Sequence, residues 1–238
     1  MSFPSVYPPK QLQVTKKLLV TIDGPAGAGK TTVSRALADR LGYRYIDTGA
    51  LYRGVAYHAK KRGVPPGDDV ALARMLEDLR LGFQRTEKGL RLTADGEDIT
   101  DRIRTPEMSM LASSVSAQPA VRAFLLQVQR ELGREKAAVF EGRDMGTVVF
   151  PAADVKFFLS ASEETRAKRR FAELQGQSPA SLEEVERDMR RRDEQDSTRA
   201  IAPLQPAADA IRIDSSAISI DRVVELMLGH ITAALERP

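Results

Sequence analysis

The chain has 238 residues, of which 42% are hydrophobic, so it is long enough to bury a sizeable core and is not disordered throughout. It contains no cysteine, which excludes disulfides, thiolate metal sites and a cysteine nucleophile, and its two histidines, His58 and His230, lie too far apart in sequence for a His-x-x-x-His metal pair. The net charge of +3 comes from 36 basic and 33 acidic residues mixed along the chain, which permits nucleic-acid binding but does not indicate it.

The first segment, residues 1–17, is polar and proline-containing, and we expect it to form a loose tail. It lacks the apolar core of a secretory signal. Elsewhere the chain has no stretch approaching the roughly 20 apolar residues that a membrane helix needs. We therefore expect a cytoplasmic protein without a membrane segment, and we expect it to be a monomer.

Short apolar runs alternate with segments of helical spacing from residue 18 onward, which predicts a three-layer α/β fold with a parallel sheet. Runs such as 18–22 are apolar on both faces, as strands between two helical layers must be. The predicted strands are residues 18–22, 43–46, 137–140, 155–159 and 210–213, and the predicted helices are residues 31–41, 50–62, 119–134 and 220–235.

One stretch interrupts this alternation. Short strand-like pieces at 81–84, 90–93 and 97–99 are separated by the turn signals Lys88-Gly89 and Asp95-Gly96, which predicts a small antiparallel β insert. We expect the insert to cover residues 70–104 and to form a small subdomain, with the core made of residues 18–69 and 105–238.

The turn after the first strand matches the phosphate-binding motif G-x-x-x-x-G-K-[ST] in full over residues 24–31, and a strand precedes it and a helix follows it, as the motif requires. Its glycines allow backbone N–H groups to converge on phosphate oxygens, beside the positive end of the helix. We expect Lys30 to reach the β- and γ-phosphates and the Thr31 hydroxyl to bind Mg²⁺. A glycine-rich turn without a ligand is the alternative. The motif indicates ATP or GTP without fixing the reaction.

Charged residues follow two of the other predicted strands. Arg53 lies about one turn into the helix after strand 43–46, and Glu141-Gly142-Arg143-Asp144 follows strand 137–140. Ligands of parallel sheets bind at the carboxyl ends of strands, so we favour a functional role for the second group. Arg53 taken alone fits a surface position equally well.

Basic and acidic residues are nearly balanced between Arg166 and Arg199, where a turn at residues 176–179 divides two helical segments. A stripe for nucleic acid would not be so nearly neutralised. The pattern predicts a helical hairpin that serves as a lid over the phosphate loop, with most of its arginines in solvent-exposed ion pairs. Arg192 and Arg199 flank Asp196 and are candidates to face the site.

Several of these blocks together resemble the bacterial cytidylate kinases, and the similarity extends over residues 18–235. The phosphate loop is shared by many families, whereas two other blocks, 142–151 and 199–204, are far more specific. The matching blocks are residues 24–31, 47–53 (DTGALYR), 103–105 (IRT), 142–151 (GRDMGTVVFP), Arg192-Asp193 with Asp196, and 199–204 (RAIAPL).

The resemblance implies a P-loop kinase core, a monophosphate-binding region and a lid at about 166–199, and a reaction in which ATP and CMP or dCMP give ADP and CDP or dCDP with Mg²⁺. For the acceptor nucleotide, it implies that Ser113, Arg122 and Asp144 read cytosine and that Arg192 and Asp196 reach the ribose. It implies that Arg53 and Arg143 hold the acceptor phosphate with help from Arg199, and that Thr48 lies beside the acceptor. The residues it implies for ATP binding are Gly24, Pro25, Ala26, Gly27, Ala28, Gly29, Lys30, Thr31 and Thr32, and those it implies for catalysis are Lys30, Arg143, Arg192 and Arg199. Thr32 follows Thr31 where a glycine and then a threonine occur in some members, so either hydroxyl could serve the metal, and the motif spacing favours Thr31.

These residue types suit transfer to a phosphate. The acceptor oxygen is already anionic near neutral pH, so no general base is needed, and arginines and Mg²⁺ offset the repulsion between two phosphate groups. A carboxylate at Asp144 can accept from the amino group of cytosine but would face the O4 of uracil lone pair to lone pair.

Three other functions stay open on the sequence. A kinase for UMP or dTMP would differ in its nucleotide preference. A P-loop switch or a nucleic-acid-stimulated ATPase would turn over ATP or GTP without any monophosphate. A regulatory subunit would bind ATP and form no ADP in the presence of CMP.

Overall fold

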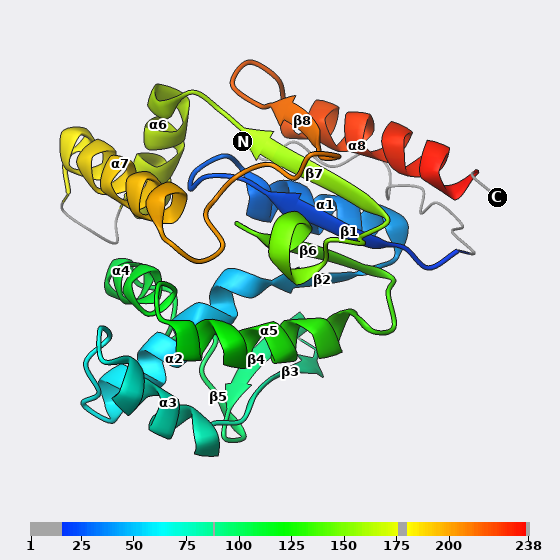
Figure 1. Cartoon of the computed structure of the whole chain (residues 1–238). Helices are drawn as coiled ribbons and strands as arrows, with labels where there is room; N and C mark the ends of the chain where they lie inside the picture. Colours follow the sequence, from blue (N-terminus) through cyan, green and yellow to red (C-terminus); the bar gives the residue numbers. More distant parts are fainter. Residues whose placement is uncertain (1–15, 88, 176–179, 237–238) are drawn as a thin grey trace.

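A five-stranded sheet, with all neighbours parallel, forms the centre of the protein in the order β2-β6-β1-β7-β8 (Figure 1). The computed structural model describes residues 16–87, 89–175 and 180–236. Each strand matches a predicted one within two residues, so the predicted parallel sheet is confirmed. The strands are β1 (Leu19–Asp23), β2 (Arg44–Asp47), β6 (Ala138–Gly142), β7 (Val155–Ser160) and β8 (Ile211–Asp214).

The strand register places the carboxyl ends of three neighbouring strands side by side. Asp23 at the end of β1 pairs with Gly142 of β6, and Glu141 of β6 pairs with Asp47 at the end of β2. The residues that follow these strands therefore start from one edge of the sheet, which is where ligands of such sheets bind.

Helices cover both faces of the sheet. On one face α1 (Lys30–Leu41) and α8 (Ile220–Leu235) pack against Val20, Ile22 and Phe157 in a dry cluster. On the other face α5 (Pro119–Gly133) and the short π-helix η1 (Met145–Val149) cover Phe140. The predicted helices 31–41, 119–134 and 220–235 are confirmed, whereas η1 was not predicted, because five residues are too few to show a helical period.

A second hydrophobic core lies beyond α5 and includes α2 (Thr48–Lys61), which the sequence also predicted (Figure 1). The predicted antiparallel insert is present as a three-stranded sheet in the order β3-β4-β5. The buried residues of this core run from Ala50 to Leu125, well beyond the predicted insert at 70–104. The strands are β3 (Leu81–Thr86), β4 (Gly89–Ala94) and β5 (Glu97–Asp98), and the further helices are α3 (Asp69–Asp78) and α4 (Pro106–Val115).

The helices α3 and α4 were missed in the sequence, although each carries a start signal. The side chain of Asp68 accepts a hydrogen bond from the N–H of Ala71, and that of Thr105 accepts one from Met108. Both are standard N-caps, and Pro106 follows Thr105 at the first helical position. Strands were the only elements predicted between residues 70 and 104, and no element was predicted for residues 106–115.

The predicted helical hairpin is confirmed as α6 (Glu163–Leu174) and α7 (Leu182–Thr198), although the predicted turn at 176–179 lies outside the described residues. A capping box between Ser181 and Glu184 starts α7. The two helices share a small apolar cluster made of Ala167, Val185 and Met189. No helix among the described residues is both long and apolar enough to cross a membrane.

Candidate active site

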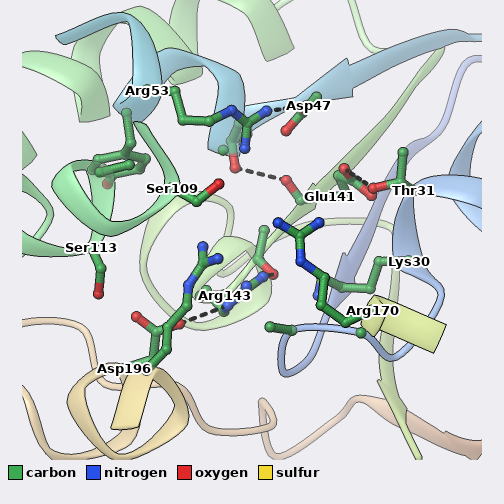
Figure 2. Close-up of a pocket in the computed structure, with 18 of the residues that line it drawn as sticks. Lys30, Thr31, Asp47, Arg53, Ser109, Ser113, Glu141, Arg143, Arg170 and Asp196 are labelled. Carbon is green, nitrogen blue, oxygen red and sulfur yellow. Dashed lines mark hydrogen bonds and ion pairs between the residues drawn. The ribbon is translucent and has the colours of Figure 1, made fainter. Parts of the chain in front are cut away.

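A cleft of about 560 Å³ opens at the carboxyl edge of the sheet, between the phosphate loop, α2, α4 and the two hairpin helices. Figure 2 shows Arg53, Arg143 and Arg170 approaching this space from α2, from the segment after β6 and from α6. Predicted site residues that line the cleft are Ala26, Gly27, Gly29, Lys30, Thr31, Thr32, Thr48, Arg53, Ser113, Arg143, Asp144, Arg192, Asp196 and Arg199.

The phosphate loop owes its shape to glycines and to the start of α1. Gly27 and Gly29 have φ of 72° and 88°, in the left-handed region that other residues avoid. No side chain caps α1 at Gly29, so the first N–H groups of the helix are available to an anion in the loop. Lys30 begins α1, and its Nζ donates to the carbonyl of Pro25 over 2.7 Å.

Lys30 carries its charge in a buried position. Burial lowers the pKa of Lys30 well below its usual range, and nearby Arg143 lowers it further, while Glu141 acts in the opposite direction. A bound polyphosphate would supply the anion that this ammonium group lacks. An anion bound beside Lys30 would favour its charged form, which burial disfavours.

Glu141 joins the phosphate loop to the neighbouring strand. One of its oxygens, Oε1, accepts from the Thr31 hydroxyl at 2.9 Å and from the Tyr45 hydroxyl at 2.8 Å. Its other oxygen, Oε2, is buried and has no hydrogen-bond partner in the described part of the chain. Burial raises the pKa of Glu141, and the carboxylate of Asp47 raises it further.

Arginines from α2, α6, α7 and the segment after β6 line the cleft together with the loop. Arg53 pairs with Asp47 at 2.8 Å, and the Nε of Arg143 donates to Asp196 at 2.9 Å (Figure 2). The Nε of Arg192 is buried and has no hydrogen-bond partner among the described residues. Burial lowers the pKa of Arg192 to about 10, and the nearby charge of Arg143 contributes to this shift. The cluster therefore holds more positive charge than its own carboxylates balance.

Asp144 lies at the bottom of the cleft and is 2% exposed. Its Oδ2 accepts a short hydrogen bond from Arg122, and its Oδ1 lies 3.5 Å from the Nη2 of Arg199. Burial raises the pKa of Asp144, and the two arginines oppose that rise. This arrangement keeps a carboxylate in a place where it can accept from a donor.

The helical hairpin of α6 and α7 touches the phosphate loop directly. Arg166 of α6 donates from Nη1 to the carbonyl of Ala26 at 3.1 Å and forms a short ion pair with Asp193 of α7. A Cβ at Gly27 would come within 2.8 Å of the Arg166 carbonyl and the Met189 side chain, so only glycine fits between loop and lid. The hairpin is thus packed against the phosphate loop at this point.

Four predicted site residues do not line the cleft. Gly24, Pro25 and Ala28 shape the loop from behind, and Arg122 is occupied by Asp144 and by the carbonyl of Ser116 at 3.3 Å. Two others line the cleft with their hydroxyls already engaged. Thr48 donates to the carbonyl of Glu141 at 2.7 Å, and Ser113 donates to the Gln195 side chain at 3.2 Å.

Several lining residues were given no individual role in the sequence analysis. Glu141 belongs to the charged run at the end of β6 for which a function was favoured, but no role was assigned to it. Arg170 was hidden among many similar arginines of the hairpin, and of the α4 residues that line the cleft only Ser113 was predicted. Lining residues without a predicted role include Arg35, Tyr52, Arg104, Thr105, Ser109, Glu141 and Arg170.

Comparison with known proteins adds independent evidence. The family model described as Cytidylate kinase matches residues 20–233. A cytidylate kinase of Geobacter sulfurreducens is 53% identical over 211 residues, which cover 88% of this chain and 91% of that protein. One from Anoxybacillus flavithermus is 46% identical over 223 residues, covering 93% and 99%.

The fold also has a counterpart among solved structures. An uncharacterized protein from Eubacterium ventriosum superposes with a TM-score of 0.51 at 12% identity, over 91% of this chain and 99% of that one, and this likeness concerns the fold alone. The family match and the relatives, which are similar along nearly their whole length, are decisive. The chain belongs to the cytidylate kinase family.

Proposed function

We propose that this protein transfers the γ-phosphoryl group of ATP to the phosphate of CMP or dCMP. As a member of the cytidylate kinase family, it phosphorylates CMP to CDP. The observation that carries the assignment of the site is that the phosphate loop and the pair of Asp144 and Arg143 line one cleft. A donor phosphate and an acceptor nucleotide can therefore meet there.

On the donor side, the N–H groups of the phosphate loop and Lys30 hold the triphosphate. Mg²⁺ fits beside Thr31, because the Glu141 carboxylate that accepts from the Thr31 hydroxyl through Oε1 keeps a second oxygen, Oε2, without a hydrogen-bond partner among the described residues, and carboxylate oxygens are hard ligands. Bound there with ATP, the ion would neutralise charge on the phosphates. Within the described residues, no group of three or more His, Cys, Asp or Glu side chains is placed to hold a metal ion.

On the acceptor side, Arg53 and Arg143 hold the phosphate of CMP, and Arg199 assists them. Guanidinium groups grip phosphate through two parallel hydrogen bonds, which orients the acceptor oxygen toward the donor. That oxygen forms a bond to the γ-phosphorus while the bond to the leaving ADP oxygen breaks. The arginines stabilise the charge spread over the transferred group, and the lid formed by α6 and α7 excludes water.

Cytosine is read by Asp144, whose carboxylate accepts from the N4 amino group. Arg122 and Arg199 fix this carboxylate from two sides, and Ser113 and Arg122 remain our candidates for the other polar edges of the base. For the ribose we propose Arg192 and Asp196. Burial acts to raise the pKa of Asp196, but Arg143, Arg192 and Arg199 together hold it below its usual value, so it stays an acceptor for a hydroxyl.

One assay tests this function. Purified protein is incubated with MgATP and CMP, dCMP, UMP or dTMP, and ADP release is followed by a coupled reaction. We expect ADP and a matching diphosphate with CMP and dCMP, and much slower turnover with the other two. Formation of ADP without any monophosphate, or a preference for UMP or dTMP, would contradict the proposal.

We also propose that the enzyme acts as a cytoplasmic monomer that binds no nucleic acid. The near balance of charge along α6 and α7 supports this view, because a nucleic-acid surface would carry a net positive stripe. Size-exclusion chromatography with light scattering, with and without RNA, tests both statements. A dimer mass, or co-elution with RNA at physiological salt, would refute the corresponding one.

A further inference from the structure

Asp23 ends β1, directly before the phosphate loop, and is 3% exposed. Its Oδ1 accepts from the N–H of Met145 at 2.9 Å, and its Oδ2 accepts from the N–H of Gly146 at 2.8 Å. These are the first two N–H groups of η1, which lack partners within the helix because they stand at its start. One carboxylate thus satisfies both and fixes the start of η1 to the end of β1.

The residue immediately before η1 is Asp144, which precedes the two N–H groups that Asp23 holds. The other end of η1 is fixed separately, since Arg130 donates to the carbonyls of Val148 and Val149 at 3.4 and 3.3 Å. Asp23 therefore controls the end of η1 that lies next to Asp144. It does not line the cleft itself, so it acts on a substrate only through other residues.

Gly146 shows how closely this junction is packed. A Cβ at Gly146 would lie 3.2 Å from the side chains of Lys156 and Thr21 and 3.4 Å from Oδ2 of Asp23. The start of η1 thus has little room to move toward β1. Small changes at Asp23 or Gly146 must therefore displace η1, and with it the backbone of Asp144.

We propose that Asp23 is a positioning residue for base selection, which holds the start of η1 so that the Asp144 carboxylate meets the cytosine amino group. Asp23 also precedes Gly24, the first residue of the phosphate loop, so one side chain ties the donor loop to the base-reading residue. This inference rests on the proposed role of Asp144 and extends it to a residue outside the cleft.

The requirement for a carboxylate makes the inference testable with a change of one atom. In Asp23→Asn, one oxygen still accepts, but the amide NH₂ replaces the other and faces a backbone N–H, donor to donor. The start of η1 then has to shift. Displacement of a reacting or reading group by a fraction of an ångström is enough to lower its effectiveness about tenfold or more.

The experiment measures kcat/KM for CMP and UMP, and KM for ATP, in the wild type and in Asp23→Asn. We expect the CMP/UMP ratio of kcat/KM to fall about tenfold while KM for ATP stays within about twofold. Asp154→Asn is the matched control, because Asp154 accepts from the N–H of Leu19 at the opposite end of β1, at 2.7 Å, and does not line the cleft. It should leave the ratio unchanged.

A double variant separates positioning from general damage. If Asp23 acts through Asp144, then Asp23→Asn combined with Asp144→Asn will show the same CMP/UMP ratio as Asp144→Asn alone. If Asp144→Asn does not change the ratio, the proposed base reader is wrong. An effect of Asp144→Asn together with an unchanged ratio in folded Asp23→Asn would overturn the positioning role alone.

Circular dichroism and thermal melting establish whether each variant folds. Should Asp23→Asn fail to fold, Gly146→Ala tests the same junction from the η1 side, since its added methyl group would lie 3.2 Å from the Thr21 and Lys156 side chains and would touch Oδ2 of Asp23. We expect a similar loss of discrimination in Gly146→Ala. An unchanged ratio in that folded variant would count equally against the inference.

Discussion

The two sides of the cleft are built in different ways. The proposed donor side is one contiguous loop, residues 24–31, which offers mostly backbone N–H groups and a single lysine to a phosphate. The proposed acceptor side is assembled from side chains of α2, α4, α7 and the segment after β6. These elements are spread along the chain from Thr48 to Thr198. A local loop needs only its own sequence, whereas the scattered side depends on every helix that carries one of its residues.

The largest effect is expected on the donor side, from Lys30→Met. The side chain keeps most of its buried volume but loses the charge that the triphosphate needs, so we expect kcat to fall by about 10³-fold or more. The coupled ADP assay measures the loss. Lys168→Met is the control, because Lys168 lies exposed on α6 and pairs only locally with Glu164. If Lys30→Met kept near-normal turnover, the loop would not act as the donor site.

This contrast also explains how far the sequence could be interpreted. The five strands and the phosphate loop were predictable because apolar runs and a spaced glycine motif are local signals. Arg53 follows a strand end but fitted a surface position equally well, and only the family resemblance suggested roles for Arg53 and Asp196. That Arg122 would lie behind Asp144 could not be predicted at all, because it depends on how α5 packs against η1.

The next largest effect tests the acceptor side through Asp144→Asn. The amide can donate to the O4 of uracil, which the carboxylate cannot, so the CMP/UMP ratio of kcat/KM should fall by about 10- to 100-fold, or roughly 1–3 kcal/mol. KM for ATP should change little, because the donor loop is untouched. Steady-state kinetics with both nucleotides gives the answer.

Asp209→Asn is a suitable companion to Asp144→Asn. It also removes a carboxylate from a buried cation, since Asp209 pairs with Lys156 at 2.9 Å, but it does so outside the cleft. Its CMP/UMP ratio should equal that of the wild type. An equal loss in both variants would mean that the acceptor side responds to any weakened ion pair rather than to the base.

A third prediction concerns the junction of the two sides and uses pH. The pKa of Asp23 is raised from 3.8 to about 6, mainly by burial and to a smaller extent by the nearby carboxylate of Asp144. The hydrogen bonds from the N–H groups of Gly146 and Met145 and the charge of Lys30 act in the opposite direction. Because the folded protein then binds more protons than the unfolded chain between these values, its stability falls as pH rises through this window.

Denaturant unfolding of the wild type and of Asp23→Asn at pH 4.5 and 7.5 isolates this contribution. Asparagine does not titrate, so the wild type should lose about 2 kcal/mol more than the variant over this range. Effects of other titrating groups cancel in the difference. Parallel pH profiles would show that the Asp23 carboxylate is ionised without a cost, in conflict with its burial.

The smallest effect returns to the donor side and asks whether a side chain supplements its backbone ligands. Glu141→Gln keeps the shape and can keep the hydrogen bonds to Thr31 and Tyr45, but it removes the negative charge of the unpartnered oxygen. Loss of an outer ligand typically weakens metal binding by 10- to 100-fold, and ATP itself provides most of the affinity here, so we expect about a tenfold higher Mg²⁺ concentration at half-maximal activity.

Titration of Mn²⁺ into the ATP complex, followed by electron paramagnetic resonance, measures the same change without turnover. Glu173→Gln is the control, because Glu173 also lines the cleft but is largely exposed and pairs with Arg170. If both variants required the same metal concentration as the wild type, the carboxylate of Glu141 would serve only to hold Thr31 and Tyr45. The donor side would then depend on its loop alone, and the contrast with the acceptor side would be complete.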